Sequence, residues 1–143
     1  MKMKKSHIRE AAFMLIFESL FCSDTCDEII EAAKDADEYE FNDEASELFR
    51  RVYVKSEELD EVIGEFSRKR AVSRIGKVNL AILRLAVYEC LFEPDVPGNV
   101  AISEAIKISQ KYTFENDTKF INGVLGSLSR SGKIPEKACE VKE

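Results

Sequence analysis

The stretch VPGNVAISEAIKISQKYTFENDTKFINGVLGSL, residues 96–128, decides how this chain folds. It contains two helical patterns, one rich in Ala and Ile and one reading FINGVLGSL. A short polar connection from Thr113 to Asp117 joins them and presents side chains outward from between two packed elements. Connections of this kind often carry function. We therefore expect a helix pair whose connecting turn belongs to a functional site.

The segment just before this stretch, residues 76–92, is the most apolar part of the chain. Its apolar residues cover nearly the whole circumference of a helix, which is typical of a helix buried among others. Pro94 and Pro97 follow it and open a turn, because proline lacks the amide donor and disfavours helix in the residue before it. Residues 76–92 are therefore expected to form the central helix of the fold.

Helical periodicity continues through almost all of the remaining chain, and no segment alternates convincingly as a strand would. The sequence therefore predicts an all-α fold. After the proline turn a helix begins after Asn99 or after Ser103, since both are good caps, and the last helix begins near Asn116 or Asp117. The other helices are expected over residues 6–22, 27–36, about 43–54 and about 56–68, with a flexible tail over 131–143.

Composition and length are those of an ordinary globular protein. The chain has 143 residues, 45% hydrophobic and 34% charged, which fits a single domain or two small subdomains sharing a core. No apolar run reaches the roughly 18 residues that a membrane span needs, and no signal-peptide cleavage pattern follows the N-terminus. Arg84 and Glu89 interrupt the apolar segment, and we expect them to form a buried charged pair. A cytoplasmic location is expected.

The four cysteines, Cys22, Cys26, Cys90 and Cys139, are scattered through helical patterns and are expected to remain reduced thiols. Cys22 and Cys26 have a spacing that could offer two metal ligands, but no second ligand pair exists in the sequence. We therefore expect no metal and no other cofactor.

Charge is strongly segregated along the chain, although the net charge is −6. Residues 24–47 hold eleven acids against one lysine. Two other segments are basic, one at the N-terminus and one between Glu65 and Glu89. If they met on one face, they could attract phosphates despite the overall charge, although each could equally be a solvated helix face. The basic segments hold Lys2, Lys4, Lys5 and Arg9 before the first acid, and Arg68, Lys69, Arg70, Arg74, Lys77 and Arg84 between Glu65 and Glu89.

Three blocks of this sequence resemble the NusB family of bacterial transcription antitermination factors. IREAAFMLIFE at residues 8–18 is similar to the first helix of the family, and RIGKVNLAILRLAVYEC at 74–90 is similar to its central helix. DVPGNVAISEAIKISQKYTFENDTKFINGVL at 95–125 is similar to the most specific region of the family. The blocks cover close to half the chain, in family order and at family spacing.

The resemblance implies an all-helical fold of two small packed bundles with about seven helices, divided into subdomains over about 1–70 and 71–130. It also implies binding of single-stranded boxA-type RNA together with NusE, a ribosomal protein, in antitermination complexes with RNA polymerase on ribosomal RNA operons. No catalysed reaction is implied. Family members occur as monomers and dimers, so a homodimer is an open alternative.

The resemblance also implies an RNA site made of the basic N-terminus and the turn before the last helix. Lysine, arginine, imidazole and amide groups suit phosphates and exposed bases. Asn116 stands where the family often has an acid, which removes a charge that would repel phosphate. A partner surface is expected on the central helix around Lys77 and Asn79. The implied RNA-binding residues are Lys4, Lys5, His7, Arg9, Asn116, Lys119 and Phe120.

Two other functions are compatible with the same blocks. One is a protein-only helical adaptor that keeps the NusE surface without binding RNA, in which case replacing Lys4, Lys5 and Arg9 would leave function intact. The other is the NusB-like module of some RNA cytosine methyltransferases. The chain shows no methyl-donor fold after the last predicted helix, which favours the antitermination factor.

Overall fold

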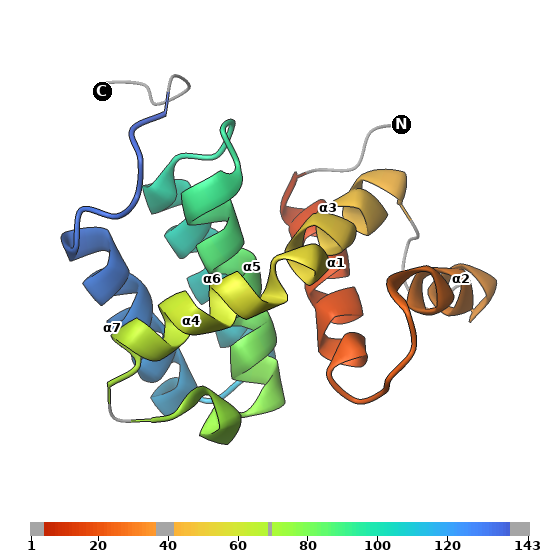
Figure 1. Cartoon of the computed structure of the whole chain (residues 1–143), viewed down its shortest axis with the longest axis horizontal. Coiled ribbons are helices and arrows are strands. Elements are labelled where there is room, and N and C mark those ends of the chain that lie inside the picture. The colour runs from red at the N-terminus through yellow and green to blue at the C-terminus, as the bar shows by residue number, and fades with distance from the viewer. Residues whose placement is uncertain (1–4, 37–41, 69, 138–143) are drawn as a thin grey trace. The chain divides into compact units, whose positions relative to one another are not determined.

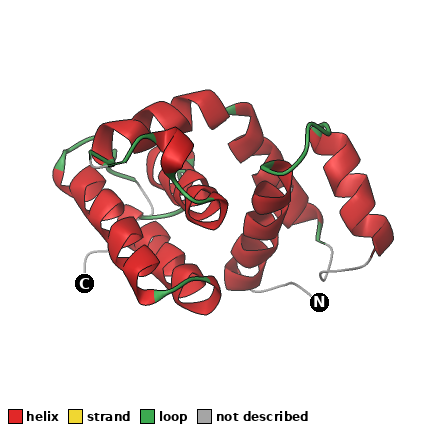
Figure 2. Ribbon diagram, turned by 90° about the horizontal axis from the view of Figure 1, so that it is seen from below, coloured by secondary structure: helices red, strands yellow, loops and turns green. Residues whose placement is uncertain are grey.

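The computed structural model describes residues 5–36, 42–68 and 70–137. Lys4, which the resemblance implies as an RNA contact, lies outside these residues, as do Lys2, Lys69 and Cys139. The described residues form seven α-helices and one short 3-10 helix, with no strand among them, which confirms the all-α prediction (Figure 2). The helices are α1 (Lys5–Ser19), α2 (Cys26–Ala36), α3 (Asp43–Val54), α4 (Ser56–Phe66), α5 (Lys77–Phe92), α6 (Gly98–Tyr112) and α7 (Glu115–Arg130), with the 3-10 helix η1 at Val72–Arg74.

The first compact unit, residues 1–56, is built around the contact of α1 with α3, and α2 packs against both (Figure 1). Phe13 and Ile16 of α1 and Phe49 of α3 are almost completely buried. Asn42 caps α3, because its side-chain oxygen accepts hydrogen bonds from the amides of Glu44 and Ala45. Apolar spacing and a good cap therefore explain this unit.

The second unit, residues 57–143, has α5 as its central helix, with α6 and α7 packed side by side against it (Figure 1). α5 is buried along almost its whole length, from Asn79 to Cys90, as its all-round apolar pattern predicts. From α7, Ile121, Leu125 and Leu128 are fully buried. The three-helix packing fixes the turn between α6 and α7 at one end of this unit.

The boundary between the units falls after Ser56, whereas the subdomain boundary was expected near residue 70. The two boundaries differ because α4 belongs to the second unit, whereas it was expected in the first subdomain. Leu59 and Ile63 of α4 are fully buried. Asp60 of α4 accepts two hydrogen bonds of 2.8 Å from the guanidinium of Arg84 on α5. The expected pairing of Arg84 with Glu89 is therefore wrong. Five positions apart, these residues lie on different faces of α5, and Arg84 faces α4 instead.

The segment after α7 folds back onto the second unit, where the sequence predicted a flexible tail from residue 131. The Lys137 ammonium is buried and donates to the carbonyls of Glu89 (2.6 Å) and Val96 (2.5 Å). Glu89 belongs to the last turn of α5, whose carbonyls lack helical partners and favour a cation. Over residues 131–137 the expected tail is therefore an ordered segment that satisfies the end of α5.

Two helix starts differ from the predicted positions. α6 begins at Gly98, directly after Pro97, because proline is well suited to the position before a helix and lacks an amide that would need a partner. α7 begins at Glu115, earlier than the expected Asn116 or Asp117, with Phe114 in the cap position. The connection between the two helices is therefore shorter than its polar sequence suggested.

Within the described residues, no helix combines the length and the apolar character needed to cross a membrane. The same part of the chain contains no cluster of three or more His, Cys, Asp or Glu side chains arranged to hold a metal ion.

Candidate nucleic-acid interface

The turn between α6 and α7 is held by three hydroxyl groups. The fully buried Ser109 lies 2.8 Å from the Thr113 hydroxyl and 2.7 Å from the Thr118 hydroxyl, oxygen to oxygen. Thr113 also donates both its hydroxyl and its amide to the carbonyl of Ser109. This hydroxyl network closes α6 and joins it to α7, so the turn has a fixed geometry.

Asp117 connects the same turn to the central helix. One of its carboxylate oxygens accepts a hydrogen bond of 2.9 Å from the Asn79 side-chain amide, and the other accepts one of 3.3 Å from the backbone amide of Phe114. An acid in the first turn of α7 also favours the helix dipole. Asp117 therefore positions the start of α7.

The partner surface expected around Lys77 and Asn79 is only partly supported by the fold. Lys77 is exposed, but Asn79 is 4% exposed and is bonded to Asp117. The expectation that Asn79 lies on the exposed side of α5 is wrong, because its side-chain amide makes a buried hydrogen bond to Asp117.

Asn116 and Lys119 project from the first turn and a half of α7 and are exposed, as the RNA-site prediction requires. The Lys119 ammonium lies 3.9 Å from the Glu115 carboxylate, with 73% of the Lys119 side chain exposed. A pair this open to water contributes little energy, so Lys119 can exchange it for a phosphate at small cost.

Phe120 is half-buried, and the guanidinium of Arg70 lies 4.3 Å from the centre of its ring. One ring face is thus already covered by a cation. This contact places the basic segment after α4 beside α7. The other exposed cations described in that segment are Arg68, Arg74 and Lys77, whereas Arg84 is bonded to Asp60.

Phe114 was not among the expected site residues, although it is the most prominent side chain of the turn. It is 83% exposed, more than any other large apolar side chain in the described part of the chain. Its position within the expected RNA-binding turn was visible in the sequence. Its exposure was not visible, because Phe114 lies seven residues before the buried Ile121 and so shares its helical stripe.

The N-terminal candidates belong to the first unit and form a group of their own. Lys5 and His7 are exposed in the first turn of α1, whereas Arg9 is only 6% exposed. Arg9 is therefore placed to support the packing of α1, and its guanidinium is not a surface group of the fold. Lys5 and His7 remain available for a polyanion.

The described residues form two helical units. One carries exposed Lys5 and His7 at the start of α1, and the other carries exposed Asn116 and Lys119 beside a hydrogen-bonded turn, which together are typical of an all-α protein that binds a polyanion. The family model described as "NusB family" matches residues 6–130. The chain belongs to the NusB family.

Named relatives and solved structures agree with this membership. The chain is 38% identical over 135 residues to the transcription antitermination protein NusB of Clostridium acetobutylicum, covering 93% of this chain and 98% of that protein. It is 38% identical to the protein of the same name from Acetivibrio thermocellus, covering 84% of each.

Among solved structures, NusB of T. maritima superposes with a TM-score of 0.80 at 30% identity, covering 94% of this chain and 96% of that one. A crystal structure of the antitermination factors NusB and NusE in complex with double-stranded RNA matches with a TM-score of 0.76. At 22% identity, this second likeness bears on the fold alone.

Proposed function

We propose that this chain is a transcription antitermination factor that binds boxA-type single-stranded RNA together with NusE, within complexes that contain RNA polymerase. The observation that carries the proposal is the family match over residues 6–130. The role needs no catalysis and no cofactor, and it places the protein in the cytoplasm, where transcription occurs.

Two groups of side chains would contact the RNA. Lys5 and His7 would supply cationic and imidazole donors from the start of α1, and Lys4, outside the described residues, would add a further cation. Asn116 and Lys119 would supply an amide and a cation from the start of α7. Lysines meet phosphates and give a salt-dependent affinity, whereas the Asn116 amide can bond to the edge of an unpaired base.

Arg9 and Phe120 would contribute to RNA binding indirectly, Arg9 by supporting the packing of α1 and Phe120 by holding Arg70. Arg9 is buried in the first unit, and Phe120 carries Arg70 on its ring. Phe120 would hold Arg70 beside α7, where the guanidinium adds positive charge near Lys119.

The test is fluorescence anisotropy of a labelled boxA-type RNA with the chain alone, with NusE, and with a scrambled RNA. Selective binding that tightens with NusE is expected. Each phosphate-contacting lysine replaced by alanine, at positions 4, 5 and 119, should reduce the steepness of the salt dependence by roughly one phosphate contact.

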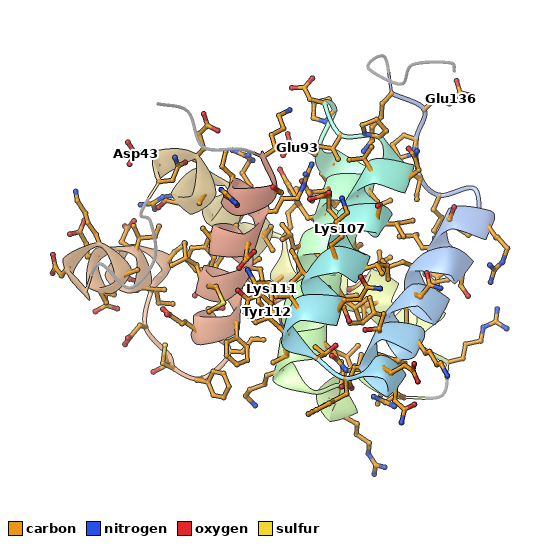
Figure 3. The ribbon with its side chains drawn as sticks, turned by 180° about the vertical axis from the view of Figure 1, so that it is seen from behind. Asp43, Glu93, Lys107, Lys111, Tyr112 and Glu136 are labelled. Carbon is orange, nitrogen blue, oxygen red and sulfur yellow. The ribbon has the colours of Figure 1, made fainter. Side chains whose placement is uncertain are left out.

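Lys107, labelled on α6 in Figure 3, provides the matched control. Its exposed ammonium pairs with Glu104 on α6, as Lys119 pairs with Glu115 on α7. Lys107→Ala should leave the salt dependence unchanged. NusE binding without any RNA selectivity would instead favour the protein-only adaptor.

A further inference from the structure

Phe114 is an exposed aromatic ring on a backbone that the fold holds in place. Its amide donates to Asp117, and its carbonyl accepts a hydrogen bond of 3.0 Å from the amide of Thr118. Asp117 is itself bonded to Asn79 of α5, and Thr118 belongs to the hydroxyl network with Ser109. The backbone that carries the ring is therefore held by contacts that reach two other helices.

The side chain of Phe114 does not take part in that packing. Phe114 has an extended backbone (φ −98°, ψ 166°), so the helical direction that buries Ile121 does not apply to it. The ring is 83% exposed and ends in solvent. A single exposed phenylalanine is unremarkable on most surfaces, but here the polar turn around it is built rigidly and presents the ring outward.

The residues next to Phe114 are charged and polar, and they include the acids Glu115 and Asp117 in the first turn of α7. Asn116 and Lys119 follow it within α7, and Lys111 and Tyr112 precede it at the end of α6, where the Lys111 ammonium lies 5.5 Å from the centre of the Tyr112 ring (Figure 3). An exposed aromatic ring with an amide and exposed lysines nearby suits an unpaired nucleotide, because the base can stack on the ring while a lysine that exchanges its carboxylate partner meets the phosphate.

We propose that Phe114 is a stacking platform for one unpaired base of the bound RNA, next to the base or phosphate held by Asn116 and Lys119. This inference rests on the proposed RNA-binding function and adds a contact to the same site. The hydrogen-bonded turn fixes the Phe114 backbone before binding, so only rotation of the side chain is lost when a base stacks on the ring.

The test uses anisotropy with boxA-type RNA and NusE, and separately measures NusE binding in the absence of RNA. Phe114→Ala and Phe114→Leu should each weaken RNA binding by about 5- to 100-fold, because leucine keeps apolar bulk but offers no aromatic face. Both variants should bind NusE as the parent chain does, and thermal unfolding should show that both are folded.

Phe114→Trp gives a direct readout, since the chain contains no tryptophan. This variant should bind RNA at least as tightly as the parent, and its single indole emission should be quenched when a base stacks on it. Phe21→Ala is the matched control, because Phe21 is also an exposed aromatic (62%) but lies in the first unit. It should leave RNA affinity unchanged.

Three outcomes would overturn the inference, and they differ in what they say of the proposed function. Selective RNA binding by the parent that is unchanged in Phe114→Ala removes the stacking role and leaves the proposed function standing. Loss of NusE binding by Phe114→Ala without RNA assigns the ring to a protein interface. No selective RNA binding by the parent chain with NusE removes the proposed function and this inference together.

Discussion

At the residue scale, the protein uses single polar groups inside apolar surroundings to fix specific contacts. Asp60 with Arg84, Asn79 with Asp117, and Lys137 with two carbonyls are examples in the second unit. Each joins segments distant in sequence. Because a half-buried or buried polar group is costly when unpaired, these pairs specify one arrangement of the helices.

Cys90 shows the effect of burial on a single ionisable group. Burial raises the pKa of the Cys90 thiol to about 12, from an ordinary value of 9.0. At pH 8, a thiol reagent should modify the exposed Cys22 quickly and Cys90 only after unfolding. Labelling followed by peptide mass spectrometry checks this, with Cys139→Ser in every sample. Equal labelling rates for Cys22 and Cys90 would contradict it.

The same shift has a consequence for stability. The folded state holds the Cys90 proton more tightly than the unfolded state, so the contribution is complete below about pH 9 and is lost as pH rises toward about 12. Urea unfolding across this range should show a decline in the free energy of unfolding. Cys90→Ala should make that decline shallower, and an unchanged profile would mean that other groups cause it.

At the element scale, the α6–α7 turn depends on contacts that α5 provides. Asn79 is the link from α5, through Asp117, to the backbone of Phe114. The turn is thus part of the three-helix unit, which makes its geometry testable by mutations that do not touch the exposed surface.

Asn79→Ala should lower the free energy of unfolding by about 1 to 2 kcal/mol, because it leaves one carboxylate oxygen of Asp117 without its donor in a partly buried site. In a double-mutant cycle with Asp117→Ala, the coupling should be about 1 kcal/mol. Urea unfolding gives both values. The exposed Asn99→Ala on α6 is the control and should change stability little. Full additivity of Asn79→Ala and Asp117→Ala would exclude the link.

At the scale of the whole molecule, the chain is organised as two compact units, with α4 in the second. The segment after α7 completes that second unit, since Lys137 covers the end of α5 and Ile134 approaches Gly98 at the start of α6. Any added side-chain carbon at Gly98 would lie 3.1 Å from Ile134, so glycine permits this close approach.

Lys137→Met should destabilise the second unit by about 1 to 3 kcal/mol, because two buried carbonyls lose a charged donor. Thermal and urea unfolding would measure the change. Lys133→Met is the matched control: its half-exposed ammonium lies 3.4 Å from Glu65, and the loss should stay below about 0.5 kcal/mol. Equal effects of the two variants would refute a special role for Lys137.

The sequence by itself determined the helical elements and the central position of α5, because apolar period, proline turns and caps are local signals. It also determined the exposure of Asn116 and Lys119 through their place beside a turn. The same turn lies within the block at residues 95–125, which resembles the NusB family most specifically.

Only the tertiary structure decided where polar and aromatic side chains face. It buried Arg9 and Asn79, paired Arg84 with Asp60, ordered residues 131–137 and turned Phe114 to solvent. These outcomes depend on partners far away in sequence and on a single extended residue before α7. Local periodicity predicts the helix face on which a residue lies. Only the packing of the helices decides whether that face is buried and which side chains contact it.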